Sequence, residues 1–203
     1  MQDSGTYTVQ VTATDGSQSE TAEDSVQVSI RKAPVEIPAA DTTPFIYNGN
    51  MQTYSIAPSD LYTVTGNVQK SADSYTVTVS LNDTDNYVWA DGSTADRTYD
   101  FVIAPKEISA VWSGLSQIYG DGKTVQAALS GVEGQDDVTA VVSGVGTDAG
   151  TYPLTAELMG SDAGNYVLTN GTATLEVKKA TPTVATLPTV SYTHLDVYKR
   201  QRH

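Results

Sequence analysis

Apolar and polar side chains alternate along several stretches of this chain. From Tyr75 to Leu81, for example, every second residue is apolar, and the residues between are threonine or serine. Such alternation puts successive side chains on opposite faces of an extended strand, whereas a helix repeats every 3.6 residues. No stretch has a convincing helical period. The pattern therefore predicts half-buried antiparallel β-strands, each with one apolar and one polar face.

The predicted strands belong to a longer unit that occurs three times. In each unit, a turn of small polar residues precedes a strand led by tyrosine, and a polar loop and a second strand follow. The apolar faces of these strands consist of Tyr7, Val9 and Val11 with Val26, Val28 and Ile30; Tyr75, Val77, Val79 and Leu81 with Tyr99, Phe101 and Ile103; and Tyr152, Leu154, Ala156 and Leu158 with Ala173, Leu175 and Val177.

A linker ends each unit, and a proline in it interrupts strand pairing and stiffens the connection. The linkers lie at intervals of about 70 to 75 residues, which sets the size of the unit. They are Lys32-Ala33-Pro34, Ala104-Pro105-Lys106 and Lys179-Ala180-Thr181-Pro182. The second and third units also share an early turn, at Tyr47-Asn48-Gly49 and Tyr119-Gly120-Asp121-Gly122, and a later Asn-Tyr-Val, at Asn86 and Asn165.

This spacing predicts the organisation of the chain. Residues 1–33 are expected to be the C-terminal part of a truncated β-repeat, 34–105 and 106–181 two β-repeats, and 182–189 the start of a further repeat. We predict an all-β fold of tandem small antiparallel β-sandwiches of immunoglobulin-like (Ig-like) type. A β-grasp-like sheet is the alternative, because five or six short strands suit either fold, although no helical pattern favours the grasp.

The last residues, 190–203, have a different origin in our interpretation. Codons for Val190 to Gln201 can be chosen so that the DNA is its own reverse complement, which resembles two transposase adapter ends placed back to back. We therefore interpret this tail as a sequencing-adapter artefact and exclude it from fold reasoning. The tail contains both histidines, His194 and His203.

Composition then excludes several functions. The chain has 11 basic and 24 acidic residues, a formal net charge of −13. Without the tail, which holds three of the basic residues and one of the acidic residues, 8 basic and 23 acidic residues remain, a net charge of −15. Such a charge opposes binding to nucleic acid, and no apolar run of about 18 residues predicts membrane insertion. Because the chain has no cysteine and its body has no histidine, disulfides, thiolate chemistry and a Ser-His-Asp triad are excluded.

The remaining candidate chemistry is a group of loop carboxylates. Asp83, Asp85 and Asp91, with Asp96, offer hard oxygen ligands for calcium, and Asp136-Asp137 is a second candidate. They lack EF-hand spacing, so solvated loop acids are the preferred interpretation, and no metal site or cofactor is predicted. A glycosidase needs only two carboxylates but also a deep cleft, which a small β-module has little room to build. We therefore expect no enzymatic activity.

Aromatic residues raise the alternative of a sugar-binding face. Tyrosines alternate with threonine in the predicted strands, which favours packing in the core over stacking on a carbohydrate. Trp89 and Trp112 are single residues without an aromatic row beside them.

Several short motifs carry a family resemblance. Tyr119-Gly120-Asp121-Gly122, the turn and strand from Gly146 to Tyr152, Gly164-Asn165-Tyr166, and Val177-Lys178-Lys179-Ala180 resemble the MBG and YDG-type repeats of large bacterial surface and secreted proteins. Residues 106–181 match this pattern best. The resemblance implies a bacterial extracellular or cell-surface location and a role as a spacer or adhesive stalk. Its partners would be neighbouring repeats of the same chain, with a host glycan or matrix protein as a further ligand.

The function expected from the sequence is therefore a non-catalytic structural or adhesive repeat segment. Two alternatives stay open. One is a carbohydrate- or host-protein-binding module, which an exposed aromatic row would favour. The other is an accessory segment of a surface hydrolase, which a catalytic domain elsewhere in the same protein would favour.

Overall fold

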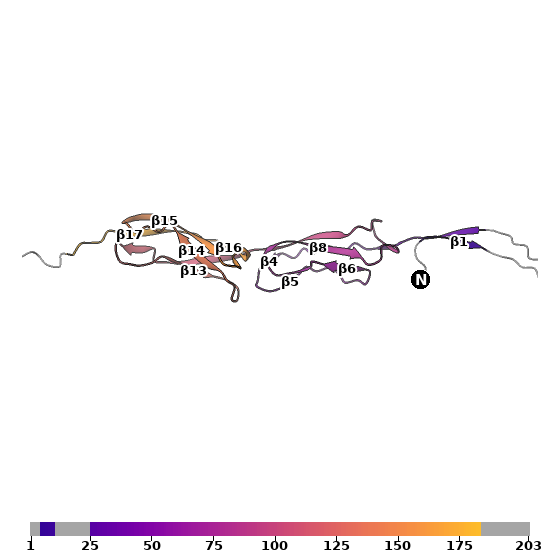
Figure 1. Cartoon of the computed structure of the whole chain (residues 1–203), viewed down its shortest axis with the longest axis horizontal. Helices are drawn as coiled ribbons and strands as arrows, with labels where there is room; N and C mark the ends of the chain where they lie inside the picture. The colour runs from indigo at the N-terminus through magenta and orange to yellow at the C-terminus, as the bar shows by residue number, and fades with distance from the viewer. Residues whose placement is uncertain (1–4, 11–24, 184–203) are drawn as a thin grey trace, which may run out of the picture.

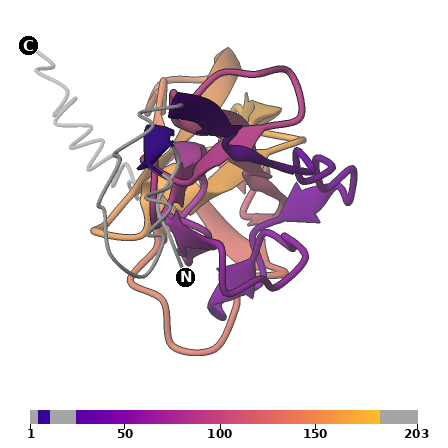
Figure 2. The ribbon, with the colours of Figure 1, turned by 90° about the vertical axis from the view of Figure 1, so that its right-hand side faces the viewer.

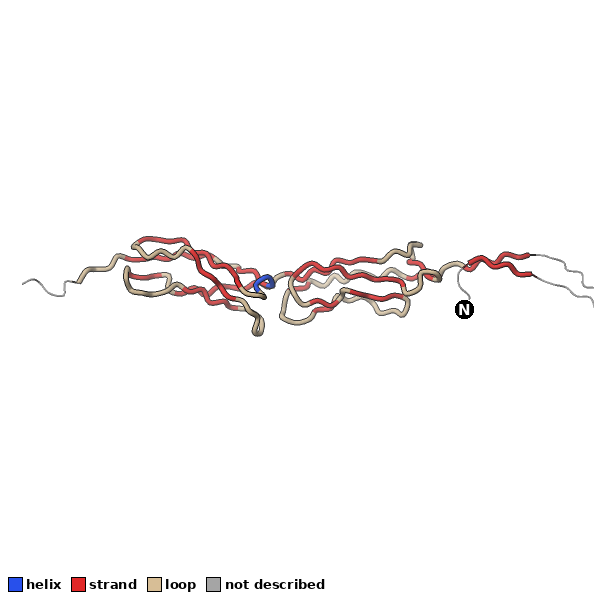
Figure 3. Tube along the Cα trace, in the orientation of Figure 1, coloured by secondary structure: helices blue, strands red, loops and turns tan. Residues whose placement is uncertain are grey.

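The computed structural model describes residues 5–10 and 25–183 of the chain. Strands make up 52% of it, and no α-helix occurs among the described residues, so the prediction of an all-β chain is confirmed. The one helical element described is a 3-10 turn, Ala163–Asn165, drawn blue in Figure 3. The predictions for Val11, for 184–189 and for the tail 190–203 lie outside the described residues.

The described strands follow one another along a single long axis. Figure 1 shows a hairpin at one end and two strand-rich bodies beyond it, formed by residues 34–105 and 106–181. Seen from the hairpin end, the bodies lie behind one another within a narrow outline (Figure 2). The hairpin and the second body therefore lie at opposite ends of the described structure.

The hairpin consists of β1 (Gly5–Gln10) and β2 (Ser25–Ile30). Its strands are antiparallel, with Tyr7 opposite Val28 and Val9 opposite Val26, so the apolar positions share one face as the alternation predicts. This face is exposed: 47% of Val9 and 59% of Val26 are accessible to solvent. No described segment covers it.

Residues 34–105, with β3 beginning one residue earlier, contain eight strands. They are β3 (Ala33–Val35), β4 (Phe45–Ile46), β5 (Gln52–Thr53), β6 (Tyr62–Thr65), β7 (Val68–Gln69), β8 (Asp73–Leu81), β9 (Tyr87–Trp89) and β10 (Arg97–Ala104). A four-stranded sheet has the order β4-β10-β8-β6, in which only the β4–β10 pair is parallel. Two small pairs, β3-β9 and β5-β7, complete this body.

Residues 106–181 contain seven strands. They are β11 (Lys106–Ser113), β12 (Ser116–Ile118), β13 (Gln126–Ser130), β14 (Thr139–Ser143), β15 (Gly150–Met159), β16 (Tyr166–Leu168) and β17 (Thr172–Lys178). The four-stranded sheet here has the order β12-β17-β15-β14, and again only its first pair is parallel. A three-stranded sheet, β13-β11-β16, completes the second body.

The two four-stranded sheets match in order, direction and register. Tyr75 lies opposite Phe101 in the first sheet, and Tyr152 lies opposite Leu175 in the second. Each tyrosine hydroxyl donates a hydrogen bond to the carbonyl four residues upstream, at 3.0 and 2.9 Å respectively. The repeat read from the sequence is therefore also a repeat of strand topology.

Side chains at the apolar positions of the alternating strands form part of the two cores, together with residues such as Trp89 that the alternation did not assign. Val77, Val79, Phe101 and Trp89 are fully buried in the first body, and Leu154 and Leu175 are buried in the second. Burying a side chain of this size stabilises the fold by about 1.5–3 kcal/mol.

Two glycines allow the strands to pack closely. Gly66 and Gly144 follow β6 and β14 with φ of 76° and 87°, a region that other residues rarely adopt. A Cβ at either position would overlap a carbonyl oxygen of the neighbouring strand of the sheet, that of Thr76 in β8 or Pro153 in β15. These turns therefore require glycine.

Candidate functional site

One residue connects the two bodies. β10 ends at Ala104, β11 begins at Lys106, and only Pro105 lies between them. Proline fixes φ near −65° and has no N–H to donate, so the connection has little freedom of rotation. The chain therefore passes from one body into the next without a flexible loop.

Two tyrosines from different bodies meet at this junction. Tyr47 follows β4, where its N–H donates to the carbonyl of Ala104 at 2.9 Å. Tyr166 begins β16, and its ring meets that of Tyr47 edge to face with centroids 5.4 Å apart. Only 2% of Tyr47 and 6% of Tyr166 are exposed. Rings in this geometry attract each other beyond the effect of burial alone.

Asp136 accepts hydrogen bonds from both tyrosines. The hydroxyls of Tyr47 and Tyr166 donate to the same oxygen, Oδ2, at 2.7 and 2.5 Å. The Tyr166 hydroxyl in turn accepts from the backbone N–H of Glu133 at 2.9 Å. One carboxylate of the second body thus holds a buried side chain of each body, and charge-assisted bonds of this kind are stronger than neutral ones.

The surroundings keep these three groups in the protonation states that the bonds require. Burial, and after it the bond to Asp136, raises the pKa of Tyr166 to about 12. Burial also raises the pKa of Tyr47, again with a contribution from Asp136. The two donated bonds, Tyr166 first, lower the pKa of Asp136. At neutral pH the phenols are therefore protonated donors and the carboxylate is an ionised acceptor.

A second polar bond crosses the junction. The N–H of Ala72, just before β8, donates to the side-chain oxygen of Asn165 at 2.8 Å. Asn165 is 8% exposed and is the one buried polar residue of the described part of the chain. A buried amide oxygen without a donor would cost free energy, so this contact favours one placement of the two bodies.

Apolar side chains of the two bodies form one continuous cluster at the junction. Tyr47, Phe101 and Ile103 of the first body pack in the same cluster as Ile108 and Tyr166 of the second. Separating the bodies would expose this surface to water. The junction is therefore held by hydrophobic contact as well as by polar bonds.

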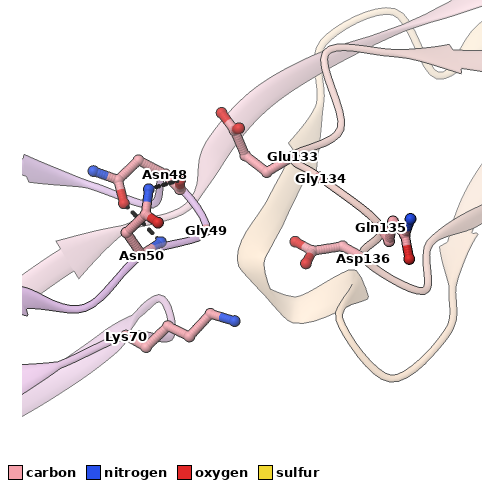
Figure 4. A pocket seen from close by; sticks show the side chains of 8 residues that line it. All are labelled: Asn48, Gly49, Asn50, Lys70, Glu133, Gly134, Gln135 and Asp136. Carbon is pink, nitrogen blue, oxygen red and sulfur yellow. Dashed lines mark hydrogen bonds between the residues drawn. The ribbon is translucent and has the colours of Figure 1, made fainter.

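A cleft of about 480 Å³ opens beside these contacts (Figure 4). Asn48, Gly49, Asn50 and Lys70 line it from the first body, and residues 133–136 line it from the second. Lys70 extends its amine toward Asp136, and its charge contributes to the lowered pKa of that carboxyl group. Lys106 forms an ion pair with Glu133 close by. The cleft is polar and lies between the bodies.

The calcium candidates Asp83 and Asp85 lie at a different place. The Asp83 carboxylate accepts the N–H of Asp85 at 3.0 Å and both the N–H and the side-chain amide of Asn86. These bonds, that from the Asn86 side chain first, lower the pKa of Asp83. The carboxylate therefore closes its own turn.

Asp91, the third candidate, also has protein partners. Both of its oxygens accept from Arg97 Nη2 at 2.7 Å, and the N–H of Ser93 donates to it at 3.0 Å. The bond from Ser93, then that from Arg97, lowers the pKa of Asp91. No group of three or more Asp, Glu, His or Cys side chains able to hold a metal occurs within residues 5–10 and 25–183.

The pair Asp136-Asp137 does not converge on one point. Asp136 faces the two tyrosines, whereas the carboxylate of Asp137 accepts bonds from the N–H and hydroxyl of Ser161 at 3.2 and 3.3 Å. The sequence pattern indicates Asp136 only as a weak calcium ligand, and it does not indicate a role at the junction. Tyr47 and Tyr166 were noted only as landmarks of the repeat.

The tryptophans point inward. Trp89 is fully buried, its Nε1 donates to the carbonyl of Ala95 at 2.8 Å, and the Arg97 guanidinium lies 5.6 Å from the ring centre. Trp112 donates to the carbonyl of Asn170 at 3.1 Å. Among large aromatic side chains of the described residues, Tyr119 stands out as exposed, at 54%.

Comparison with protein-family models, curated proteins and solved structures finds no match to this chain. Within the described residues, no helix has the length and apolar character needed to cross a membrane. The function must therefore be argued from the geometry of the junction.

Proposed function

We propose that this chain is a non-catalytic structural or adhesive repeat segment, a spacer or stalk of a large bacterial surface or secreted protein. In this proposal, residues 34–105 and 106–181 are tandem Ig-like sandwiches joined end to end. The observation that carries it is the interlocked junction, where Asp136 binds one buried tyrosine from each body. A spacer has to hold its ends apart, and a closed junction resists the bending that a free linker permits.

The packing of two layers supports the sandwich form. The inner face of the four-stranded sheet, at Val77 and Val79, packs in clusters that also contain Tyr54, Val35 and Trp89, which lie outside that sheet. The hydroxyls of Tyr75 and Tyr152 each donate to the carbonyl four residues upstream, and a similar tyrosine contact occurs in immunoglobulin-like domains. The lack of an α-helix among the described residues disfavours the β-grasp alternative.

The dimensions fit a spacer. Residues 97–113 form β10, Pro105 and β11 in direct succession. At about 3.3 Å per residue, a continuous extended segment of this length spans roughly 55 Å. The net negative charge of the chain opposes side-by-side association through like-charge repulsion, which leaves neighbouring repeats of the same chain as the natural partners. The bacterial and extracellular location rests on the resemblance to MBG and YDG-type repeats.

Distance measurements between spin labels test the stiffness of the junction. Because the chain has no cysteine, cysteines introduced at the exposed positions Thr98 and Thr174 would be labelled alone. We expect one narrow distance distribution, as narrow as that of a control pair within the first body, Thr42 and Thr98. A distribution much broader than the control would show that the bodies move freely, and it would overturn the proposed function.

A further inference from the structure

Tyr119 occupies the same structural position as Tyr47. Each follows a short strand, β4 or β12, that pairs in parallel with the last strand of its body. The N–H of Tyr47 donates to Ala104 at 2.9 Å, and the N–H of Tyr119 donates to Lys178 at 2.8 Å. Ala104 and Lys178 are the final residues of β10 and β17. The two tyrosines are therefore equivalent in topology and in backbone bonding.

Ala149 is likewise equivalent to Ala72. Each alanine lies three residues before the tyrosine that leads the long strand of its sheet, Tyr75 or Tyr152, and these tyrosines match in register. In the first body, Ala72 donates its N–H to Asn165. The groups that receive residues 106–181 at the junction thus have counterparts at the far end of 106–181.

The two ends differ in what covers them. Tyr47 is 2% exposed because Tyr166 and Asp136 pack on it, whereas Tyr119 is 54% exposed. Ala149 is exposed, whereas Ala72 is partly covered. A cleft of about 390 Å³ lies beside Tyr119 and is lined on its other side by residues 145–148. This end therefore carries an exposed tyrosine and an exposed alanine at the backbone positions whose counterparts are bonded at the junction.

We propose that the end of residues 106–181 that carries Tyr119 and Ala149 is a docking surface for a further β-body of the same kind. This inference rests on the proposed function and names the partner's chemistry. The occupant resembles residues 106–181, because that body already covers the equivalent end of 34–105. It places a carboxylate on the Tyr119 hydroxyl, as Asp136 does for Tyr47, and an asparagine side-chain oxygen on the Ala149 N–H.

The partner's requirements are narrow. Its carboxylate must sit in a loop, as Asp136 does, and its asparagine must directly precede a tyrosine, as Asn165 precedes Tyr166. A body that lacks the carboxylate would leave the Tyr119 hydroxyl without a charged acceptor. A body that lacks the asparagine would leave the Ala149 N–H without its acceptor. Both groups are therefore needed for the closed arrangement.

An extended chain tests this directly. In the extended chain, a second copy of residues 105–181 follows Lys178. Pro105 of this copy then follows Lys178, just as Pro105 follows Ala104 in the parent chain. The parent chain is measured beside it for comparison. Only residues 1–178 carry the isotope label, introduced by segmental ligation, and amide exchange is followed by NMR. The Ala72 amide, already bonded to Asn165, serves as the internal control.

We expect the Ala149 amide to exchange at least about fivefold more slowly in the extended chain, the ratio that a hydrogen bond of ordinary net strength gives. Asn165→Ala in the appended copy should restore fast exchange at Ala149. Tyr119→Phe, which keeps the ring and removes only the hydroxyl, should reduce the protection without unfolding either body.

Two contrary outcomes are distinct. If the Ala149 amide exchanges equally fast in the parent and the extended chain while the Ala72 amide is protected, the proposed docking surface is wrong and the proposed function still stands. Fast exchange at Ala72 in both chains would mean that the existing junction does not hold, and it would overturn both proposals.

Discussion

Replacing Asp136 with alanine removes the acceptor that two buried tyrosine hydroxyls share. Tyr47 and Tyr166 bond to one oxygen of Asp136 at 2.7 and 2.5 Å, and both are almost fully buried. A buried donor without an acceptor costs about 1–3 kcal/mol, so two donors set a range of about 2–6 kcal/mol. Water in the adjoining cleft can accept part of these bonds. We therefore expect Asp136→Ala to lower the free energy of unfolding by about 2–4 kcal/mol.

Two variants separate this effect from the general loss of a carboxylate. Asp136→Asn keeps an oxygen that can accept both hydroxyl bonds but removes the charge, and bonds to neutral groups are about half as strong. We expect it to cost about 1–2 kcal/mol. Asp137→Ala removes the neighbouring carboxylate, which accepts exposed bonds from the N–H and hydroxyl of Ser161 and none from the two tyrosines. It should change stability by no more than about 0.5 kcal/mol.

Urea unfolding measures these differences, with thermal unfolding as a second readout. In a chain of this size, each 1 kcal/mol shifts the melting midpoint by about 2–4 °C. The parent chain should unfold residues 34–181 in one transition, because the apolar cluster and the two bonds to Asp136 together join the bodies; Asp136→Ala removes those bonds and should separate two transitions. If Asp136→Ala stays within about 0.5 kcal/mol of the parent and keeps one transition, the junction is not held by this carboxylate.

Four further predictions follow from the structure and the sequence. Because the pKa of Tyr166 is raised to about 12, its contribution is full below pH 10 and is lost as pH rises toward 12; pH-dependent unfolding should show this loss, and Tyr166→Phe should show a smaller one, because the raised pKa of Tyr47 still contributes. At 10 mM, calcium should raise the melting midpoint by no more than magnesium does, since the Asp83 and Asp91 oxygens already have partners; a calcium-specific rise above about 5 °C that Asp85→Ala abolishes would contradict this. A chain ending at Thr189 should melt within error of the full chain, and a loss above about 1 kcal/mol would contradict the artefact interpretation. Hydrogen exchange should be faster at Val9 and Val28 than at Val79 and Leu175, and equal protection at all four would show that the hairpin is held as firmly as the bodies.

The long strands could be predicted because an alternating pattern is recognisable only over several consecutive residues, and these strands are long enough to contain it. β8 and β15 have 9 and 10 residues, so their period of two is plain. β4 has only 2 residues and carries no detectable period, although it places Tyr47 at the junction. Its parallel pairing with β10 joins residues far apart in the sequence, and local patterns contain no information on such a pair.

The junction itself could not be predicted from local patterns. Tyr47 and Asp136 are separated by 89 positions, and no spacing rule links a turn tyrosine to a loop carboxylate at that distance. The one available signal was the repeat. Tyr47 and Tyr119, like Asn86 and Asn165, recur at matching points near the ends of the units, where a structural role between units is the simplest reason for them to recur.

Half of the junction belongs to each body, and this division has a consequence for how such a chain is built. At the junction, residues 34–105 supply the Tyr47 hydroxyl and the Ala72 N–H, and residues 106–181 supply Asp136 and Asn165. Residues 106–181 also carry Tyr119 and Ala149, the counterparts of Tyr47 and Ala72, at their other end. Complementary groups at opposite ends allow contacts head to tail and do not pair like ends. A partly exposed tyrosine such as Tyr119 is tolerated because its ring is apolar while its hydroxyl is polar. If the proposed docking surface is correct, Tyr119 would become a buried donor once a further body supplied the carboxylate, as Tyr47 is at the junction.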